Sequence, residues 1–132
     1  MITYDTRTYP TVSPYLYYED GDTAIDWLTR VFGFRERLRG HHPDGTFGHG
    51  EVEAGEGDGV IMLGTPDGFR RADRSCFGVY VHVEDLDAHF AQATREGATI
   101  TDEPADQAHG VRRYGALDLE GNQWWFAQPL GS

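Results

Sequence analysis

The residues best suited to chemistry in this 132-residue chain are two histidines and a glutamate. His49 and Glu51 stand two positions apart, so on a β-strand their side chains would project from the same face. With His82 they would supply the donors of a two-histidine, one-carboxylate metal site. His49 and Glu51 could also act as a general base and the carboxylate that orients it. A solvated strand face or a simple hydrogen-bonded pair would give the same pattern, because an exposed face carries polar residues at every second position.

The composition narrows the class of protein. Acidic residues number 22 and basic residues 11, all of them arginine, which gives a formal net charge of −11. Nucleic acid and anionic membrane surfaces would repel such a chain, and the lack of lysine excludes a lysine Schiff base. The sequence has no 18-residue apolar run and no apolar stretch near its start that would resemble a secretory signal. With a single cysteine, Cys76, that cannot form an internal disulfide, these features favour a cytoplasmic protein of one domain.

An internal repeat organises the chain. Three landmarks recur in nearly one register: Glu19-Asp20 with Glu84-Asp85 (65 positions apart), Glu53 with Asp118 (65), and Gly33 with Gly97 (64). Each copy is too short to bury both faces of a sheet, so the copies should pair around a shared core or cavity. We therefore predict that residues 1–132 form a single domain of two repeats, at about 12–63 and 77–128, joined by a linker at 64–75.

Both repeats read as strand, helix and three strands, which predicts an α+β fold of two βαβββ modules. In the first repeat a strand at 12–18 precedes a helix at 23–31, capped by Asp22 and closed by Gly33. The remaining predicted strands lie at 34–40, 47–54, 60–63, 77–83, 98–101, 113–119 and 123–128, with a second helix capped by Asp85 and a loop at 104–111.

Strand alternation assigns side chains to two faces. Val79, Val81 and Val83 should cover the second helix, and by the repeat Leu16 and Tyr18 should cover the first. The opposite faces would then form an aromatic wall with a few polar groups: Tyr15, Tyr17, His49, Glu51, Met62, Tyr80, His82 and Trp125, with Phe47 beside them. Tyrosine and tryptophan on strands commonly pack in the core or lie half-buried. The argument for a ligand therefore depends on several of them lying on the same face of the sheets. Such a wall suits a flat, partly apolar organic compound.

Two arginines precede Tyr114 near the start of the 113–119 strand. Arg112 and Arg113, with Tyr114 beside them, could clamp an anionic ligand at the rim of the cavity. Alternatively, the two arginines offset the acidic surface.

The paired βαβββ modules and the ending from Asp118 to Trp124 (DLEGNQW) are similar to the vicinal-oxygen-chelate superfamily, which includes glyoxalase I, bleomycin-resistance proteins and extradiol dioxygenases. The resemblance covers roughly residues 12–128. It implies two curved sheets with helices on their outer faces around a cavity, and a homodimer. The metalloenzymes of the superfamily hold a divalent metal with four side chains, one from the opening and one from the closing strand of each module. By position these are Ser13, Met62, Gly78 and Trp125, which do not make a ligand set for a hard or borderline divalent ion.

Together these features predict a metal-independent, cofactor-free binding protein similar to the bleomycin-resistance branch. It would hold an aromatic or partly apolar organic compound in a cavity, with drug sequestration as one role and an accessory role in small-molecule metabolism as another. The alternative is an enzyme, a glyoxalase-type lyase or isomerase or a dioxygenase, with its metal displaced to His49, Glu51 and His82. The departure from the metal-ligand pattern favours the binding protein over the enzyme.

Overall fold

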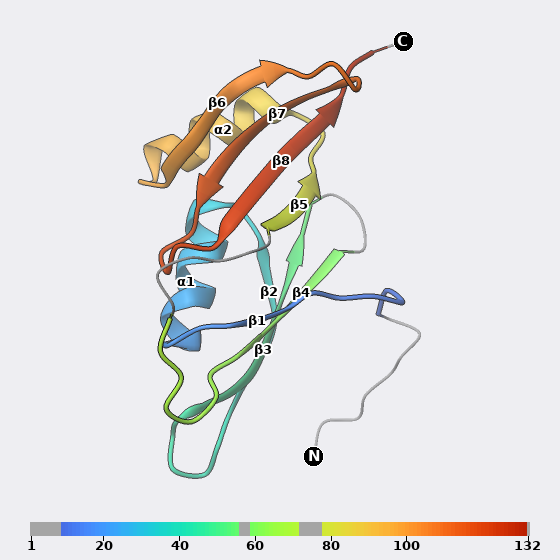
Figure 1. Ribbon diagram of the computed structural model, residues 1–132. Helices are drawn as coiled ribbons and strands as arrows, with labels where there is room; N and C mark the ends of the chain where they lie inside the picture. Colours follow the sequence, from blue (N-terminus) through green and yellow to red (C-terminus); the bar gives the residue numbers. More distant parts are fainter. Residues whose placement is uncertain (1–8, 56–58, 72–77, 132) are drawn as a thin grey trace.

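The computed structural model describes residues 9–55, 59–71 and 78–131. Two helices and eight strands follow one another in the predicted order, twice strand, helix and three strands (Figure 1). The elements are β1 (Tyr15–Tyr17), α1 (Gly21–Val31), β2 (Arg35–His41), β3 (Phe47–Ala54), β4 (Gly59–Gly64), β5 (Gly78–His82), α2 (Leu86–Arg95), β6 (Thr99–Asp106), β7 (Val111–Leu117) and β8 (Gln123–Pro129). The predicted α+β class with two βαβββ modules is confirmed.

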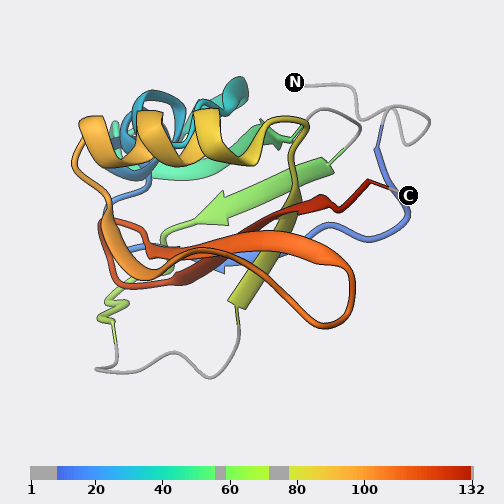
Figure 2. The same ribbon diagram turned by 90° about the horizontal axis from the view of Figure 1, so that it is seen from above.

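Each module forms a four-stranded mixed sheet. The strand orders are β1-β4-β3-β2 and β5-β8-β7-β6, and in both sheets the first strand pairs in parallel with the last strand of its module. Both helices lie on one side of the two sheets, as the view from above shows (Figure 2). The opposite faces of the sheets are therefore open. The resemblance implied sheets curved around a cavity, and in the described residues the two sheets do not close on each other.

Helix α1 follows the predicted apolar stripe but begins two residues earlier. Asp20, and not the predicted Asp22, is the N-cap, and its carboxylate accepts hydrogen bonds from the backbone and hydroxyl of Thr23 at 3.1 and 2.9 Å. Asp20 has extended backbone angles, as an N-cap residue requires. Ala24, Ile25, Leu28 and Val31 are fully buried beneath the helix.

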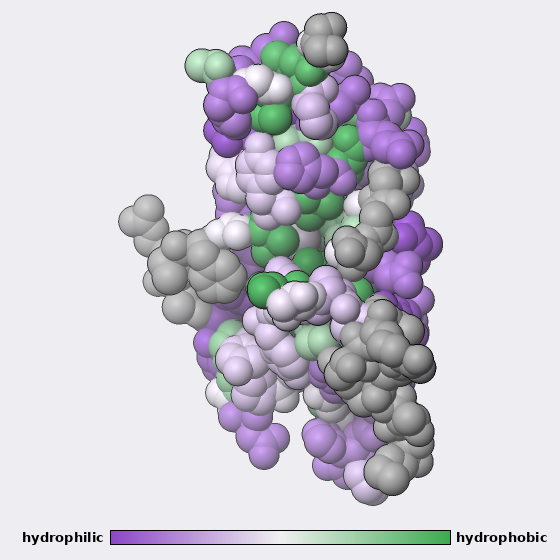
Figure 3. Space-filling view, turned by 90° about the vertical axis from the view of Figure 1, so that its right-hand side faces the viewer, coloured by the Kyte–Doolittle hydropathy of each residue, from purple (hydrophilic) through white to green (hydrophobic). Residues whose placement is uncertain are grey.

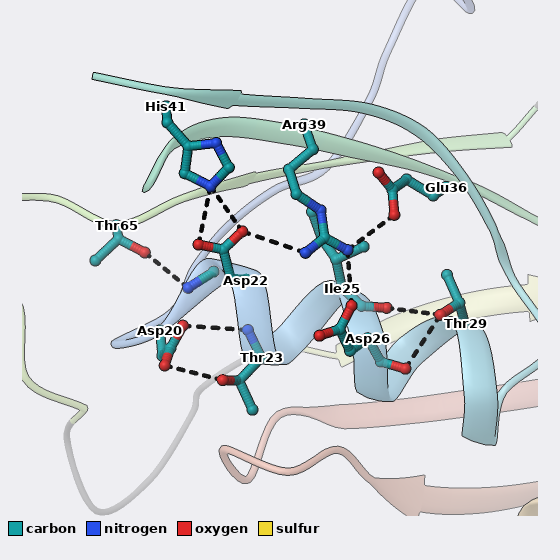
Figure 4. Close-up of polar contacts among 11 residues, drawn as sticks. Asp20, Asp22, Thr23, Ile25, Asp26, Thr29, Glu36, Arg39, His41 and Thr65 are labelled. Atoms are coloured by element: carbon teal, nitrogen blue, oxygen red, sulfur yellow. Dashed lines mark hydrogen bonds and ion pairs between the residues drawn. The ribbon is translucent and has the colours of Figure 1, made fainter. Parts of the chain in front are cut away.

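Because Asp22 does not cap the helix, it is available to bind β2. Figure 4 shows the Arg39 guanidinium among the carboxylates of Asp22, Asp26 and Glu36, at 3.2, 2.8 and 2.8 Å. His41 Nε2 lies 2.9 Å from Asp22. Asp26 first, and then Glu36, raise the pKa of Arg39 above its ordinary value. The cluster fixes the outer strand β2 to the solvent-facing side of α1.

The two modules share one core within the chain. Phe32, at the end of α1, packs edge-on against Trp124 and Phe126 of β8, with ring centroids 5.5 and 4.8 Å apart. Phe34 adds a contact to Trp124 at 5.4 Å. His89 of α2 crosses the boundary with a 2.8 Å hydrogen bond between its Nε2 and the Phe32 carbonyl oxygen. This packing holds the helices side by side and so orients both open sheet faces away from them.

A buried carboxylate connects the modules at the other end of this core. Asp118, 6% exposed, accepts hydrogen bonds from the Tyr18 hydroxyl at 2.6 Å and from the Trp124 indole at 3.0 Å. It also accepts from the backbone N–H groups of Glu120 and Asn122 and from the Asn122 side chain. Burial, followed by the negative charge of Asp118, raises the pKa of Tyr18 well above its ordinary value, so the hydroxyl stays protonated and donates. Asp118 therefore joins β1 of one module to the β7–β8 turn of the other.

Several sequence-based boundaries need correction. Strand β6 runs through Pro104 to Asp106, where a loop was predicted, because an edge strand tolerates proline on its unpaired side. Phe47 is buried on the helix side, away from His49, because the register between β2 and β3 shifts near Gly48 and reverses the parity. The repeat in the sequence paired Glu53 with Asp118. In the sheet register the equivalent of Glu53 is Leu117, one residue earlier.

Cys76 lies outside the described residues. Within the described ranges no helix is long and apolar enough to cross a membrane.

Replacing Asp118 with alanine should destabilise the fold by about 2–4 kcal/mol, because the buried Tyr18 hydroxyl and Trp124 indole would lose their acceptor. Urea denaturation measures this loss. Asp102→Ala, at an exposed position on β6, is the control and should change stability by less than about 0.5 kcal/mol. Equal midpoints for the two variants would contradict the role assigned to Asp118.

Candidate functional site

The predicted wall residues occupy the open faces of the two sheets in matching rows. In the first sheet one row across the strands is Tyr15, Met62 and Glu51, and the next row is Tyr17, Gly64 and His49. In the second sheet the equivalent rows are Tyr80, Trp125 and Gly115, and then His82, Ala127 and Arg113. The repeat therefore places His49 and Arg113 at the same position of their sheets, and likewise Glu51 and Gly115.

Aromatic rings stand exposed on both faces. Tyr15 is 46% exposed, Tyr17 52% and Tyr80 41%, which are high values for residues on strands. Tyr15 and Tyr17 meet edge to face, with ring centroids 5.8 Å apart, and Tyr80 lies 5.5 Å from the His82 ring. Neither helix of the described residues covers these rings, so about half of each side chain remains open to a ligand.

A fully buried carboxylate lies beneath the first of these faces. Glu51 is 0% exposed, and each of its oxygens has a partner. Oε1 accepts from the Tyr9 hydroxyl at 2.7 Å and lies 3.5 Å from Nε of Arg37, while Oε2 lies 2.9 Å from Nε2 of His49. Arg37 balances the buried charge, and its guanidinium stacks over the Tyr9 ring at 4.2 Å.

The carboxylate also determines how His49 is protonated. A carboxylate only accepts hydrogen bonds, so Nε2 of His49 carries the proton, and in the neutral ring Nδ1 is left as an acceptor. Nδ1 lies 3.0 Å from the Tyr15 hydroxyl, which then donates to it. Partial burial, then the neighbouring Tyr17 and Glu51, raise the pKa of Tyr15. The result is a chain of hydrogen bonds from buried Glu51 through His49 to an exposed phenol.

The second face is built differently. The Trp125 indole passes over Gly115, where a Cβ atom would lie only 2.7 Å from the ring, and close to Gly78, where it would lie at 3.4 Å. The guanidinium of Arg113 stacks over this indole at 4.5 Å from the ring centroid. Glycine on both neighbouring strands thus lets the indole lie close to the sheet.

A cleft of about 360 Å³ opens where the two sheets meet, between the start of β4 and β5. Apolar side chains gather near the middle of the face seen in Figure 3, which is the right-hand side of the molecule as drawn in Figure 1. Tyr80 and His82 line the cleft, and its apolar walls, which sequence reasoning missed, include Val12, Pro14 and Val60. Pro14 was the feature of the sequence that could have indicated the cleft. Proline has no backbone N–H, so it cannot donate a hydrogen bond to the neighbouring strand β4.

One predicted residue lies elsewhere. Tyr114 is fully buried on the helix side of β7, where its hydroxyl lies 2.5 Å from His89 Nδ1 and its ring stacks on Phe126. Strand parity gives the reason, since Tyr114 alternates with Arg113 and must point away from the face that Arg113 occupies. Tyr114 is therefore removed from the ligand-binding set.

The profile of the Glyoxalase/Bleomycin resistance protein/Dioxygenase superfamily matches residues 10–126. The chain belongs to this superfamily. An uncharacterized protein of Mycobacterium bovis, Mb0911c, is 30% identical over 128 residues, which cover 92% of this chain and 84% of the relative. TioX from Micromonospora sp. ML1 is 35% identical and superposes with a TM-score of 0.72, covering 93% of this chain and 98% of TioX. TnmS3, an antibiotic binding protein from Streptomyces sp. CB03234, shares the fold at 20% identity and a TM-score of 0.64, with 91% and 97% covered.

Metalloenzymes of this superfamily would place their metal ligands at positions that here hold Ser13, Met62, Gly78 and Trp125. These residues do not fit a divalent ion. The Ser13 hydroxyl is buried without a hydrogen-bond partner, but one hydroxyl, a soft thioether, a glycine and an indole do not complete a coordination shell. The displaced set of His49, Glu51 and His82 is not brought together either, since the described residues contain no group of three or more His, Cys, Asp or Glu side chains placed to hold a metal.

Replacing Glu51 with glutamine should release His49 from its fixed protonation. In the native protein the neutral imidazole should carry its proton on Nε2, as measured by ¹⁵N chemical shifts of the ring, and in Glu51→Gln both tautomers should appear. The variant should also lose about 2 kcal/mol of stability, because Arg37 loses its buried counter-charge. Glu53→Gln, which breaks an exposed pair with Arg35, is the matched control and should change neither property. An unaltered tautomer in Glu51→Gln would contradict the assignment.

Proposed function

We propose that this protein binds a flat, aromatic or partly apolar small molecule on its open sheet faces, without a metal or other cofactor. The proposal depends on one observation. Three aromatic side chains, Tyr15 and Tyr17 on β1 and Tyr80 on β5, are exposed, whereas the residues that alternate with them on these strands are buried. Large exposed apolar surface on a folded domain commonly marks a binding site. The alternating pattern supplies a flat apolar surface with hydrogen-bonding groups at its edge, which are the elements of a small-molecule site.

The family context supports a binding role. TnmS3, which has the same fold, is an antibiotic binding protein, and sequestration of a drug-like compound is the corresponding role for this chain. Sequestration needs no bond chemistry, in agreement with the absence of a fitting ligand set at the metal positions of the superfamily. Function within one fold depends on the side chains of the site, so the proposal rests on the aromatic faces rather than on the fold.

A second candidate function is an enzyme that uses His49 as a general base. The hydrogen-bond chain from Glu51 through His49 to Tyr15 favours it, because a buried carboxylate that orients an imidazole is the arrangement of an activated base. Against it, Nδ1 of His49 is occupied by Tyr15, so a substrate would have to displace or act through that phenol. The binding role therefore remains the primary proposal.

Binding can be tested with a neutral bicyclic probe, 2-naphthamide, by isothermal titration calorimetry. We expect Tyr80→Leu and Trp125→Leu each to weaken binding by about tenfold, since the loss of an aromatic contact costs roughly 1–1.5 kcal/mol. Trp27→Phe is the control, because Trp27 packs against Phe32 on the helix side and should leave the affinity unchanged. Equal affinity in all three variants, or no binding of the probe by the native protein, would sink the proposal.

We further propose that a second copy of the chain covers the open faces and completes the site. The exposed apolar side chains are concentrated there, and Val12 at the cleft is 80% exposed. Sedimentation velocity should show a dimer for the native protein and a shift towards monomer for Val12→Asp, which places a charge in this apolar surface. Ala91→Asp, on the exposed side of α2, should leave the dimer intact. A native protein that sediments as a monomer at micromolar concentration would remove the dimer from the proposal.

A further inference from the structure

The open faces of the two sheets have equivalent strand rows but differ in the charged side chains that they carry. His49 in the first sheet and Arg113 in the second occupy the same position, because each stands across from the small residue of its row, Gly64 or Ala127. His49 is held by Glu51 two residues along its strand. The residue two along from Arg113 is Gly115, so Arg113 lacks the acid that holds His49 at the equivalent position, and the acid across from Gly115, Asp102 on β6, forms no ion pair with Arg113.

The neighbouring residue, Arg112, differs from Arg113 in its acidic partners. Arg112, on the other face of β7, pairs with Asp87 at 3.1 Å and Asp106 at 3.2 Å. Arg113 has no carboxylate within 4.0 Å among the described residues, although the chain carries 22 acidic residues. Of the two arginines that sequence analysis could not separate, Arg112 pairs with acidic side chains, whereas Arg113 forms no ion pair with any described residue and stacks on an indole.

Arg113 is also held in place before any ligand arrives. Its guanidinium stacks on the Trp125 indole, which itself lies close to the sheet over Gly115. Stacking fixes the plane of the guanidinium and leaves its N–H edge free, which is the geometry that binds a planar carboxylate through two parallel hydrogen bonds. The side chain therefore loses little rotational freedom when an acid binds.

The row of Arg113 continues across the sheet to a second polar side chain. Ala127, fully buried, separates Arg113 on one neighbouring strand from exposed His82 on the other. Two strand spacings, about 10 Å, lie between the strands of Arg113 and His82. The adjacent row continues with Trp125 and exposed Tyr80, against which an aromatic ring can pack.

We infer that the second sheet is an anion subsite and that the ligand is an aromatic carboxylate, its acid paired with Arg113 and its ring against Tyr80 and Trp125. This inference rests on the proposed small-molecule binding function and adds the chemical class of the ligand. The chain as a whole carries a net charge of −11 and attracts no anion in general, so any preference for an acid must come from this position.

The test compares two probes of nearly equal shape, 2-naphthoate and the neutral 2-naphthamide, by calorimetry at pH 7. The native protein should bind 2-naphthoate about tenfold more tightly, the effect of one charge-assisted bidentate contact of roughly 1.4 kcal/mol. Arg113→Gln should abolish this preference and change the affinity for 2-naphthamide less than twofold. Arg112→Gln is the matched control and should keep the preference, and Arg113→Lys, which keeps the charge but lacks the fork, should keep only part of it.

The outcomes separate this inference from the function on which it rests. If the native protein binds both probes equally well, or if Arg113→Gln retains the preference for 2-naphthoate, the anion subsite is wrong while the aromatic binding face stands. If neither probe binds, the binding face itself is wrong and the anion subsite falls with it. Circular dichroism and thermal melts of each variant confirm that a lost preference is not a loss of fold.

Discussion

The shared carboxylate of Asp118 is the interaction on which the arrangement of this protein depends. A carboxylate that is almost fully buried is costly unless its lone pairs are satisfied, and here five hydrogen bonds satisfy them. One of these bonds comes from Tyr18 of the first module and the others from the turn and strand of the second. All the hydrogen bonds of Asp118 therefore form only when the two modules are correctly placed, and they hold the modules in that placement. Arg71 reinforces it by donating to the Asn122 side chain and to the Tyr17 carbonyl oxygen.

This junction determines which surfaces are available for function. With Phe32 packed against Trp124 and Phe126, both helices lie on one side, and the faces that carry Tyr15 and Tyr80 open on the other. The aromatic rings are exposed because the core is already filled from the helix side. The proposed ligand and the proposed second copy of the chain would both cover these rings. In that proposal one face of each sheet provides stability and the other provides recognition.

The two open faces differ in chemistry although their strand rows are equivalent. Equivalent rows present a tyrosine at the same place, Tyr15 and Tyr80, but their other members differ. The first sheet keeps a buried acid beneath a histidine, which gives a neutral hydrogen-bonding surface with a defined direction. In the second sheet a glycine replaces the acid and a tryptophan occupies the space, which leaves a positive, stacked surface. None of this resembles the metal-ligand set of the superfamily's metalloenzymes, so fold and chemistry have separated in this chain.

The sequence by itself determined the repeat, the order of elements and the parity of most wall residues. Those features depend on periodicities of 3.6 and 2 and on cap residues such as Asp85, which are local and need no knowledge of the partner strand. Local rules failed where a longer-range contact decided the result. Asp20 is the N-cap and Asp22 binds Arg39 instead, and Phe47 points to the core because the pairing of β3 with β2 shifts by one residue.

Only the tertiary structure decided which polar residues act together. The sequence placed His49 and Glu51 on one face but also grouped them with His82, which lies on the other sheet. It left Arg112 and Arg113 equivalent, although strand pairing gives one of them two carboxylates and the other an indole. Hydrogen bonds and ion pairs depend on distances of a few ångströms between residues far apart in the chain, and hydrophobic periodicity carries no information about those distances. The fold could therefore be read from the sequence, whereas the charge and polarity of each binding face came from the packing of the strands.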